Sequence, residues 1–186
     1  MKSPFYFIVK PLDGKRYNNT KTIEGVNIIT SSSEEDYKFS NRKGIVHQVP
    51  LHYNGPIKIG DILLVHHNVF KYYNDMRGRQ QSGKSYFKDD LFFIDNDQFF
   101  LYKQNNKWYT HDKYCFIKPI KTEESFLSKN GEEPLIGVVK YNNRLLEQKG
   151  VKEGDRISFT PNSEYPFMLD GEKLYRMFVN NITMVL

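Results

Sequence analysis

The 186-residue sequence has a single cysteine, a single tryptophan and no long run of apolar residues. With Cys115 alone, no disulfide can form within the chain, and this suits a reducing compartment. Cys115 lies in an apolar segment, so we expect its thiol to be buried and unreactive. The apolar stretch at residues 5–9 is too short for a signal peptide, and no stretch approaches a membrane span. We therefore expect a soluble cytoplasmic protein without a membrane partner.

The sequence also lacks the usual marks of catalysis. It has no glycine-rich phosphate loop, no nucleophile elbow and no distinctive pair of carboxylates. His66 and His67 are adjacent, so on a strand their side chains would point to opposite faces and could not share a metal ion. The other histidines lack carboxylate or thiol partners at metal-binding spacing: His47, His52 and His111. We expect no enzyme activity, no cofactor and no metal site.

A two-part motif occurs twice in the chain. Residues 44–46 (GIV) and 57–62 (IKIGDI) return as residues 137–139 (GVV) and 151–157 (VKEGDRI). The two parts are separated by nearly the same distance in both copies. A repeat that keeps its spacing predicts two copies of one structural unit.

The likeness between the copies extends in both directions. Residues 7–12 are matched by residues 116–120, and both segments end their apolar run with Lys-Pro. Residues 92–97 resemble residues 167–172, since each has an apolar run followed by an Asp turn. These limits predict one domain over residues 1–114 and a second, shorter domain over residues 115–186, near the low end of usual domain sizes.

Short apolar segments rich in Ile, Val, Phe and Tyr predict an all-β fold. They are bounded by Gly, Pro, Asn and Asp, as is typical of small barrels and sandwiches. In the repeated Lys-x-Gly-Asp, glycine permits a positive φ and the aspartate can accept backbone N–H bonds, which predicts a turn. A helix is expected only at residues 143–149. The expected strands are residues 5–10, 44–49, 61–66, 91–94, 98–103, 114–118, 136–140, 156–160, 173–178 and 183–186.

The first copy carries a longer loop than the second, at residues 15–42. Polar flanks surround a compact apolar centre, Gly25-Val26-Asn27-Ile28-Ile29. Long loops without structure of their own are typically functional or disordered, and an apolar patch on such a loop can dock reversibly in a groove of a partner. In the alternative interpretation, residues 25–30 form another strand packed on the barrel.

This arrangement resembles the GroES-type co-chaperonins. The resemblance rests on the first strand ending in Lys-Pro, the long polar loop with its aliphatic centre, Arg-x-Gly-Ile-Val at residues 42–46, and Ile-Lys-x-Gly-Asp-Ile at residues 57–62. In the second copy it rests on residues 150–155 and on Leu-Asp-Gly-Glu-Lys-Leu-Tyr at residues 169–175. It implies two tandem GroES-like small β-barrels. It also implies that the long loop is the family's mobile loop, with its chaperonin contacts at Val26, Asn27, Ile28 and Ile29.

The resemblance further implies a co-chaperonin-like lid that binds a chaperonin ring and assists the folding of enclosed proteins. Members of that family form seven-membered rings, so a homo-oligomer is expected. Abundant Lys and Asn with little Ala indicates an AT-rich genome, such as that of a bacteriophage or a low-GC bacterium; a phage protein would act in the host cytoplasm. The alternative is a structural or assembly protein, for example of a virion, that keeps the same fold.

A second insertion in the first copy, residues 71–90, mixes cations with aromatic residues. Such a mixture is typical of nucleic-acid-binding loops, in which cations meet phosphates and rings stack on bases. The net charge of +5 points weakly in the same direction. A solvated loop over the barrel rim is the simpler interpretation. The candidate nucleic-acid or assembly contacts are Arg77, Arg79, Lys84 and Lys88.

Overall fold

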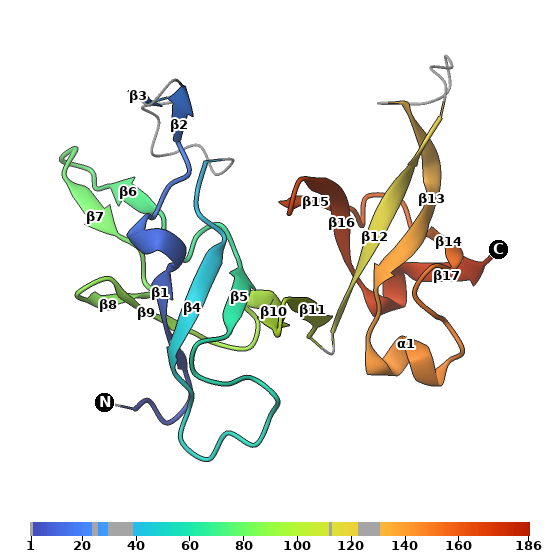
Figure 1. Cartoon of the computed structure of the whole chain (residues 1–186), viewed down its shortest axis with the longest axis horizontal. Helices are drawn as coiled ribbons and strands as arrows, with labels where there is room; N and C mark the ends of the chain where they lie inside the picture. Colours follow the sequence, from blue (N-terminus) through green and yellow to red (C-terminus); the bar gives the residue numbers. More distant parts are fainter. Residues whose placement is uncertain (1, 24–25, 30–38, 112, 123–130) are drawn as a thin grey trace. The chain divides into compact units, whose positions relative to one another are not determined.

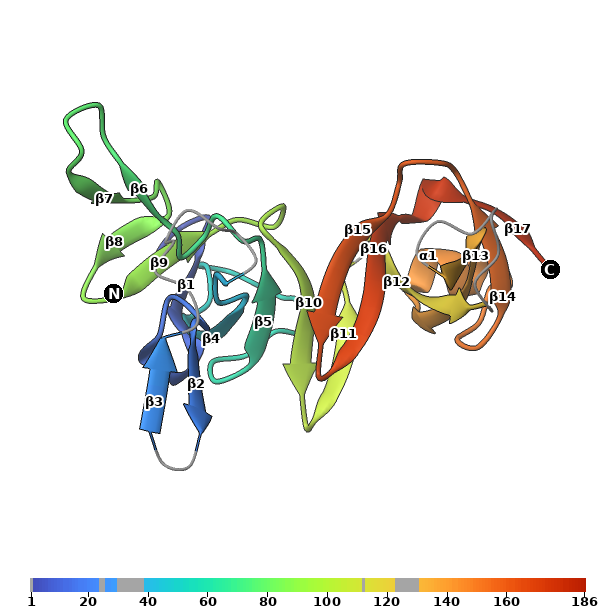
Figure 2. The same cartoon turned by 90° about the horizontal axis from the view of Figure 1, so that it is seen from above.

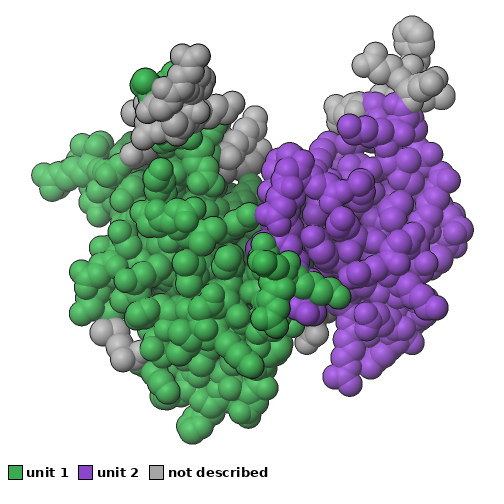
Figure 3. All heavy atoms as spheres, in the orientation of Figure 1, with its two compact units in different colours: residues 1–107 green, residues 108–186 purple. Residues whose placement is uncertain are grey.

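A computed structural model of the chain describes residues 2–23, 26–29, 39–111, 113–122 and 131–186. The chain is predominantly β and consists of antiparallel strands, as the sequence predicts. It divides into two compact units, Met1–Lys107 and Trp108–Leu186 (Figure 3). The division falls at the start of β11 (Lys107–Thr110), whereas the sequence places the boundary after Tyr114, inside the next strand.

Each unit contains a sheet with six strands in an equivalent order (Figure 1). In unit 1 the order is β8-β9-β1-β4-β5-β10. In unit 2 the order is β15-β16-β12-β13-β14-β17. Position by position, the chain connects these strands in the same sequence, so the two copies of the motif have folded into one topology twice.

The strands of unit 1 are β1 (Phe7–Pro11), β4 (Lys43–Gln48), β5 (Ile62–Val65), β8 (Tyr86–Lys88), β9 (Leu91–Ile94) and β10 (Phe99–Gln104). Those of unit 2 are β12 (Tyr114–Lys121), β13 (Glu132–Tyr141), β14 (Arg156–Phe159), β15 (Tyr165–Leu169), β16 (Glu172–Phe178) and β17 (Ile182–Val185). All ten expected strands are present. The expected helix is α1 (Arg144–Gln148), which begins after Asn143, whose side chain accepts a hydrogen bond from the Leu146 N–H.

The registers of the first strand pair agree between the units. Pro11 of β1 lies opposite Gly44 of β4, and Pro119 of β12 lies opposite Gly137 of β13. A β-bulge interrupts both pairs two residues before the proline, between Ile8 and Val9 in unit 1 and at the equivalent position in unit 2. The Lys-Pro and Gly-Ile-Val or Gly-Val-Val parts of the repeat are therefore partners across one strand pair.

The repeated Lys-x-Gly-Asp is the same turn in both units, which confirms the prediction. In unit 1 the Asp61 carboxylate accepts from the Lys58 N–H at 2.7 Å, and Gly60 has a φ of +92°. In unit 2 the Asp155 carboxylate accepts from the Lys152 N–H at 2.7 Å, and the glycine φ is +93°. A side chain is strained at such a φ, so glycine is the residue suited to this place.

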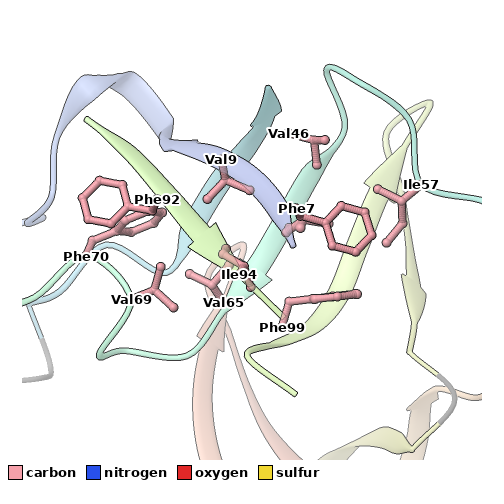
Figure 4. Packing of buried hydrophobic residues seen from close by; sticks show 11 residues of the cluster. Phe7, Val9, Val46, Ile57, Val65, Val69, Phe70, Phe92, Ile94 and Phe99 are labelled. Carbon is pink, nitrogen blue, oxygen red and sulfur yellow. The ribbon is translucent and has the colours of Figure 1, made fainter. Parts of the chain in front are cut away.

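Each unit has its own hydrophobic core under its sheet. In unit 1, rings and aliphatic side chains from β1, β5, β9 and β10 converge with those of the loop after β5 (Figure 4). Phe70 and Phe92 meet edge to face at 4.8 Å between ring centroids, and Phe7 meets Phe99 at 5.5 Å. The core of unit 2 includes Cys115, Ile117, Val139, Leu146, Val151, Ile157, Phe159 and Met177.

One part of the sequence repeat is wrongly matched. Residues 92–94 belong to β9, and the equivalent strand in unit 2 is β16, not the segment around residues 167–169 in β15. The true equivalents are the turns before these strands, Asp89-Asp90 and Asp170-Gly171, whose residues all have positive φ. The first turn lacks glycine, so its sequence does not indicate a left-handed hairpin turn. For this reason the Asp95 turn, and not the Asp89-Asp90 turn, was matched with Asp170-Gly171.

A substitution at Gly137 tests the close approach of strands β12 and β13. A methyl group there would lie 2.9 Å from the Lys118 carbonyl oxygen and against the buried Ile117 side chain. At Gly44 the nearest atom is the end of the Phe70 ring, at 3.0 Å. We expect Gly137→Ala to lower the free energy of unfolding by about 1–3 kcal/mol, because backbone cannot give way, and Gly44→Ala to cost less.

Urea denaturation followed by far-UV circular dichroism measures both variants. Fluorescence of Trp108, the only tryptophan, follows the same denaturation as a second probe. An equal or greater loss in Gly44→Ala would contradict this account of the strand contact.

Candidate functional site

The apolar centre of the long loop is a β-hairpin. β2 (Thr20–Ile23) pairs with β3 (Val26–Ile29) in a two-stranded sheet of its own, with Thr20 opposite Ile29 and Ile23 opposite Val26. Figures 1 and 2 both show this hairpin projecting from the sheet of unit 1. The expectation of a loop without regular structure is thus wrong for these residues. β-branched residues dominate both strands and favour extended backbone.

All four predicted chaperonin contacts lie on β3. Val26 is 63% exposed and Ile28 is 45% exposed, so two aliphatic side chains that alternate along the strand face solvent. The side chains of Asn27 and Ile29 lie outside the described part, as do residues 30–38 of the loop. The alternative interpretation, a strand packed on the barrel, is correct about the strand, but the strand pairs only with β2 in the described chain.

The base of the long loop is held by backbone hydrogen bonds between its two arms. Tyr17 and Ser40 form an antiparallel bridge, and the Asn18 N–H donates to the Phe39 carbonyl at 2.7 Å. The buried Asn41 side chain donates to the carbonyls of Leu12 and Lys15, at 3.0 and 2.7 Å. The loop therefore leaves unit 1 as a closed antiparallel stem, although its polar composition suggested no structure.

The second insertion also forms strands that the sequence analysis missed. β6 (Tyr72–Asn74) and β7 (Gln80–Ser82) make a second projecting hairpin, followed by the edge strand β8. The Asp75 carboxylate accepts from the backbone N–H groups of Arg77 and Arg79, at 2.8 and 2.9 Å, and so orders the tip. The signal was available, because an Asp followed by Gly three residues on is typical of a turn.

The structure separates the four predicted cations into two pairs. Arg77 and Arg79 share the tip of the β6–β7 hairpin, while Lys84 precedes β8 and Lys88 ends it. All four are exposed, and within the described residues none of them forms an ion pair. The sequence analysis did not anticipate the neighbouring Met76, which is fully exposed at the same tip.

The two adjacent histidines are not arranged as expected. β5 ends at Val65, so they lie in a turn, and their ring centroids are 4.1 Å apart. The strand argument against a shared ligand is therefore wrong. Burial lowers the pKa of His67 to about 4, with further contributions from the charges of His66, Arg42 and Lys71. His67 is thus neutral near pH 7 and belongs to the packing of the turn.

Cys115 is completely buried in β12, as predicted. Burial raises the pKa of its thiol to about 12, so the reactive thiolate is scarce at neutral pH. In unit 2, Glu172 forms ion pairs with Lys118 at 2.5 Å and with Lys140 at 3.1 Å, and hydrogen bonds from these two lysines lower its pKa. These charges link β12, β13 and β16, and they are partly exposed and therefore contribute little to stability.

Among the residues described, no three His, Cys, Asp or Glu side chains gather where they could hold a metal ion. No helix in that part of the chain is long and apolar enough to cross a membrane. No protein-family model matches the chain, and no curated protein matches it. The geometry of the two hairpins and the duplicated sheet is therefore the basis for assigning a function.

His67 predicts a specific pH dependence of stability. Below pH 6.5 the unfolded chain binds a proton at His67, whereas the folded chain binds it only near pH 4, so the free energy of unfolding falls as the pH drops through this range. We expect His67→Gln to show a shallower fall between pH 6.5 and 4 than the natural protein.

Denaturant titrations at several pH values measure the slopes. His47→Gln, at an exposed position on β4, is the matched control and should follow the natural protein. Identical slopes for His67→Gln and the natural protein would rule out a half-buried neutral His67.

Proposed function

We propose that the chain is a co-chaperonin-like lid protein that binds a chaperonin ring through the β2–β3 hairpin. The observation that carries the proposal is the pair of exposed aliphatic side chains, Val26 and Ile28, on a hairpin that projects from a duplicated six-stranded unit. An exposed apolar patch on a projecting element is typical of a surface that contacts a partner. The resemblance in sequence to the GroES-type family supplies the kind of partner.

The proposed fold is a tandem of two GroES-like small β-barrels. Support comes from the agreement of strand order, strand register, bulge and Lys-x-Gly-Asp turn between the units. Each unit is small, and several copies of the chain in a ring would each present one hairpin. Weak contacts that act together produce tight binding that is still released when a few of them break. The proposed setting is the cytoplasm of the host.

Docking replaces water around Val26 and Ile28 by an apolar groove. Each aliphatic side chain contributes about 1.5–3 kcal/mol when fully buried, so one hairpin provides modest affinity. Because β2 and β3 are already paired, less chain must be ordered on binding than with an unstructured loop. With a preformed hairpin, a smaller part of the burial free energy is therefore offset by the entropy cost of ordering the chain, and the affinity is higher.

Replacing both exposed aliphatic residues tests the docking hairpin. We expect Val26→Asp with Ile28→Asp to abolish co-sedimentation of the full chain with a purified chaperonin ring and ATP, because each carboxylate would have to lose its hydration in an apolar groove. The same variant should fail to support the refolding of a protein enclosed by the ring.

Ile59→Asp is the matched control, since Ile59 is 60% exposed and lies in the Lys-x-Gly-Asp turn of the same unit. It should bind as the natural protein does. If the natural protein does not co-sediment with the ring under these conditions, or if the double variant still does, the lid function is refuted.

The second candidate function is nucleic-acid binding or assembly through the insertion at residues 71–90. Four exposed cations without ion pairs in the described chain favour it, together with the ordered tip around Asp75. Exposed cations that form no ion pair can release counterions from phosphates. This candidate would make the chain a nucleic-acid-binding or assembly protein and not a folding lid.

Salt-dependent retention on immobilised single-stranded DNA separates this candidate from the first. If it is correct, the natural protein is retained at low salt, and Arg77→Ser with Arg79→Ser loses retention, because two phosphate contacts disappear. Lys149→Ser with Lys152→Ser removes the same charge from exposed positions in unit 2 and should leave retention unchanged. Equal retention of both double variants would contradict it.

A further inference from the structure

Arg16 lies at the root of the long loop, next to the Tyr17–Ser40 bridge, and its guanidinium is enclosed by aromatic rings. The guanidinium carbon is 4.2 Å from the centroid of Tyr72 and 4.8 Å from those of Tyr86 and Phe92. These rings belong to β6, β8 and β9. A cation over ring faces at such distances is attracted by their negative centres, and more strongly when it is shielded from water.

The edges of the same guanidinium make polar contacts with the insertion. Nη2 and Nε donate to the Asp90 carboxylate at 2.9 and 3.2 Å, and Nη1 donates to the Ser82 hydroxyl at 2.9 Å. The Arg16 side chain is only 9% exposed, whereas the Asp90 side chain is 56% exposed, so the arginine is largely shielded from water but its ion pair lies at the surface. A guanidinium is planar, so its edges can donate hydrogen bonds while its faces lie against aromatic rings. A lysine ammonium group lacks this flat shape and cannot make both kinds of contact in the same arrangement.

Tyr17 makes a second connection to the same insertion. Its hydroxyl oxygen accepts a hydrogen bond from the Tyr72 N–H at 2.8 Å. The rings of Tyr17 and Tyr72 stack, with 6.0 Å between centroids and 18° between planes. Two consecutive residues at the loop root therefore hold the first strand of the inserted hairpin, one through its charge and the other through its ring and hydroxyl.

The root lies close to the proposed docking element along the chain. β2 begins at Thr20, directly beyond Asn18 and Asn19, and the Asn18 N–H is bonded to the opposite arm of the stem. Little chain is available in this arm to turn the hairpin relative to its root. Contacts that fix Arg16 and Tyr17 should therefore limit the directions in which Val26 and Ile28 can be presented.

The two insertions also occur together in the chain. Unit 1 has both the long loop between β1 and β4 and the added segment between β5 and β8, whereas the corresponding connections in unit 2 are shorter in sequence. The Arg16 contacts join the two additions directly. If residues 71–90 were only a solvated loop at the edge of the sheet, there would be no reason for them to bury Arg16 from the other insertion.

We propose that residues 71–90 are a buttress that fixes the direction of the β2–β3 hairpin, and that Arg16 is the positioning residue through which it acts. The inference rests on the proposed function in one respect, that this hairpin is the docking element. A hairpin held in its binding direction loses less orientational freedom on docking, so the buttress raises affinity without touching the partner.

The direction of the hairpin can be measured without any partner. Spin labels on Thr20→Cys in β2 and His47→Cys in β4 occupy exposed positions of unit 1, and buried Cys115 does not compete for the label. We expect one narrow distance distribution in the natural background. Arg16→Lys should broaden it, because the ammonium keeps the charge but loses the fork and the ring contacts.

Arg79→Lys is the matched control, with the same chemical change at the exposed tip of the inserted hairpin. It should leave the distance distribution unchanged. Tyr17→Phe removes only the hydroxyl that accepts from Tyr72 and should broaden the distribution less; it serves if Arg16→Lys does not fold. A broad distribution in the natural background, or a narrow one in both root variants, would overturn the proposal.

Binding to the chaperonin ring is the second readout. Arg16→Lys should weaken binding about tenfold, because a less constrained hairpin loses more orientational freedom on docking, while circular dichroism still reports a folded chain. If the natural protein does not bind the ring, the lid function fails, and the label distances still decide whether Arg16 positions the hairpin. Unchanged affinity with a broadened distribution would show that direction does not matter for docking and would refute the buttress.

Discussion

The backbone of one valine in each unit connects the central strands of its sheet to the turn that follows. The Val46 carbonyl accepts from Gly60, and its N–H donates to the Asp61 carbonyl, both at 2.8 Å. Val139 makes the same two bonds in unit 2, at 2.8 and 2.9 Å. These bonds set where the next strand begins, so strand order and the position of the core side chains depend on them. The glycine that donates must adopt a φ near +90°, which explains why the motif is retained in both copies.

The six-stranded sheet is the same in both units, so the units differ in the segments that connect its strands. Unit 1 adds the β2–β3 hairpin between β1 and β4 and the β6–β7 hairpin between β5 and β8. Neither addition changes the order of the central strands. The additions instead contact one another through Arg16 and Tyr17. The features that distinguish unit 1 from unit 2 are therefore the reasonable places for its function.

Much of the sheet framework could be predicted from the sequence because its signals are local. Short apolar segments rich in Ile, Val, Phe and Tyr between turn residues located ten of the strands, and Lys-x-Gly-Asp located the turn at Gly60 and Gly154 correctly. The short strands β6, β7 and β8 were missed, since three residues carry no periodicity. The Asp89-Asp90 turn was also missed, because aspartate rarely adopts a positive φ twice in succession.

The root of the long loop could not be predicted, because its contacts join residues distant in the sequence. Nothing near Arg16 indicates that Tyr72, Tyr86 and Asp90 will surround it, and its burial depends on the folding of both insertions. The apolar centre at Val26 and Ile28 was visible as composition, but its pairing with Thr20–Ile23 required the structure. The composition of the loop thus located the candidate contact residues, Val26 and Ile28. The strand pairing and the Arg16 contacts that support them were revealed only by the fold.

The closed stem of the long loop has a consequence for how such a protein can change over generations. Because Tyr17 and Ser40 bring the two arms together, whatever lies beyond them is a loop whose ends are already joined. The entropy cost of closing a loop grows only with the logarithm of its length, at about 0.6 kcal/mol for each doubling. Beyond the stem, residues can be gained, lost or exchanged at little cost to the sheet. The stem therefore allows the outer segment to vary in length and sequence while the rest of the chain stays constant.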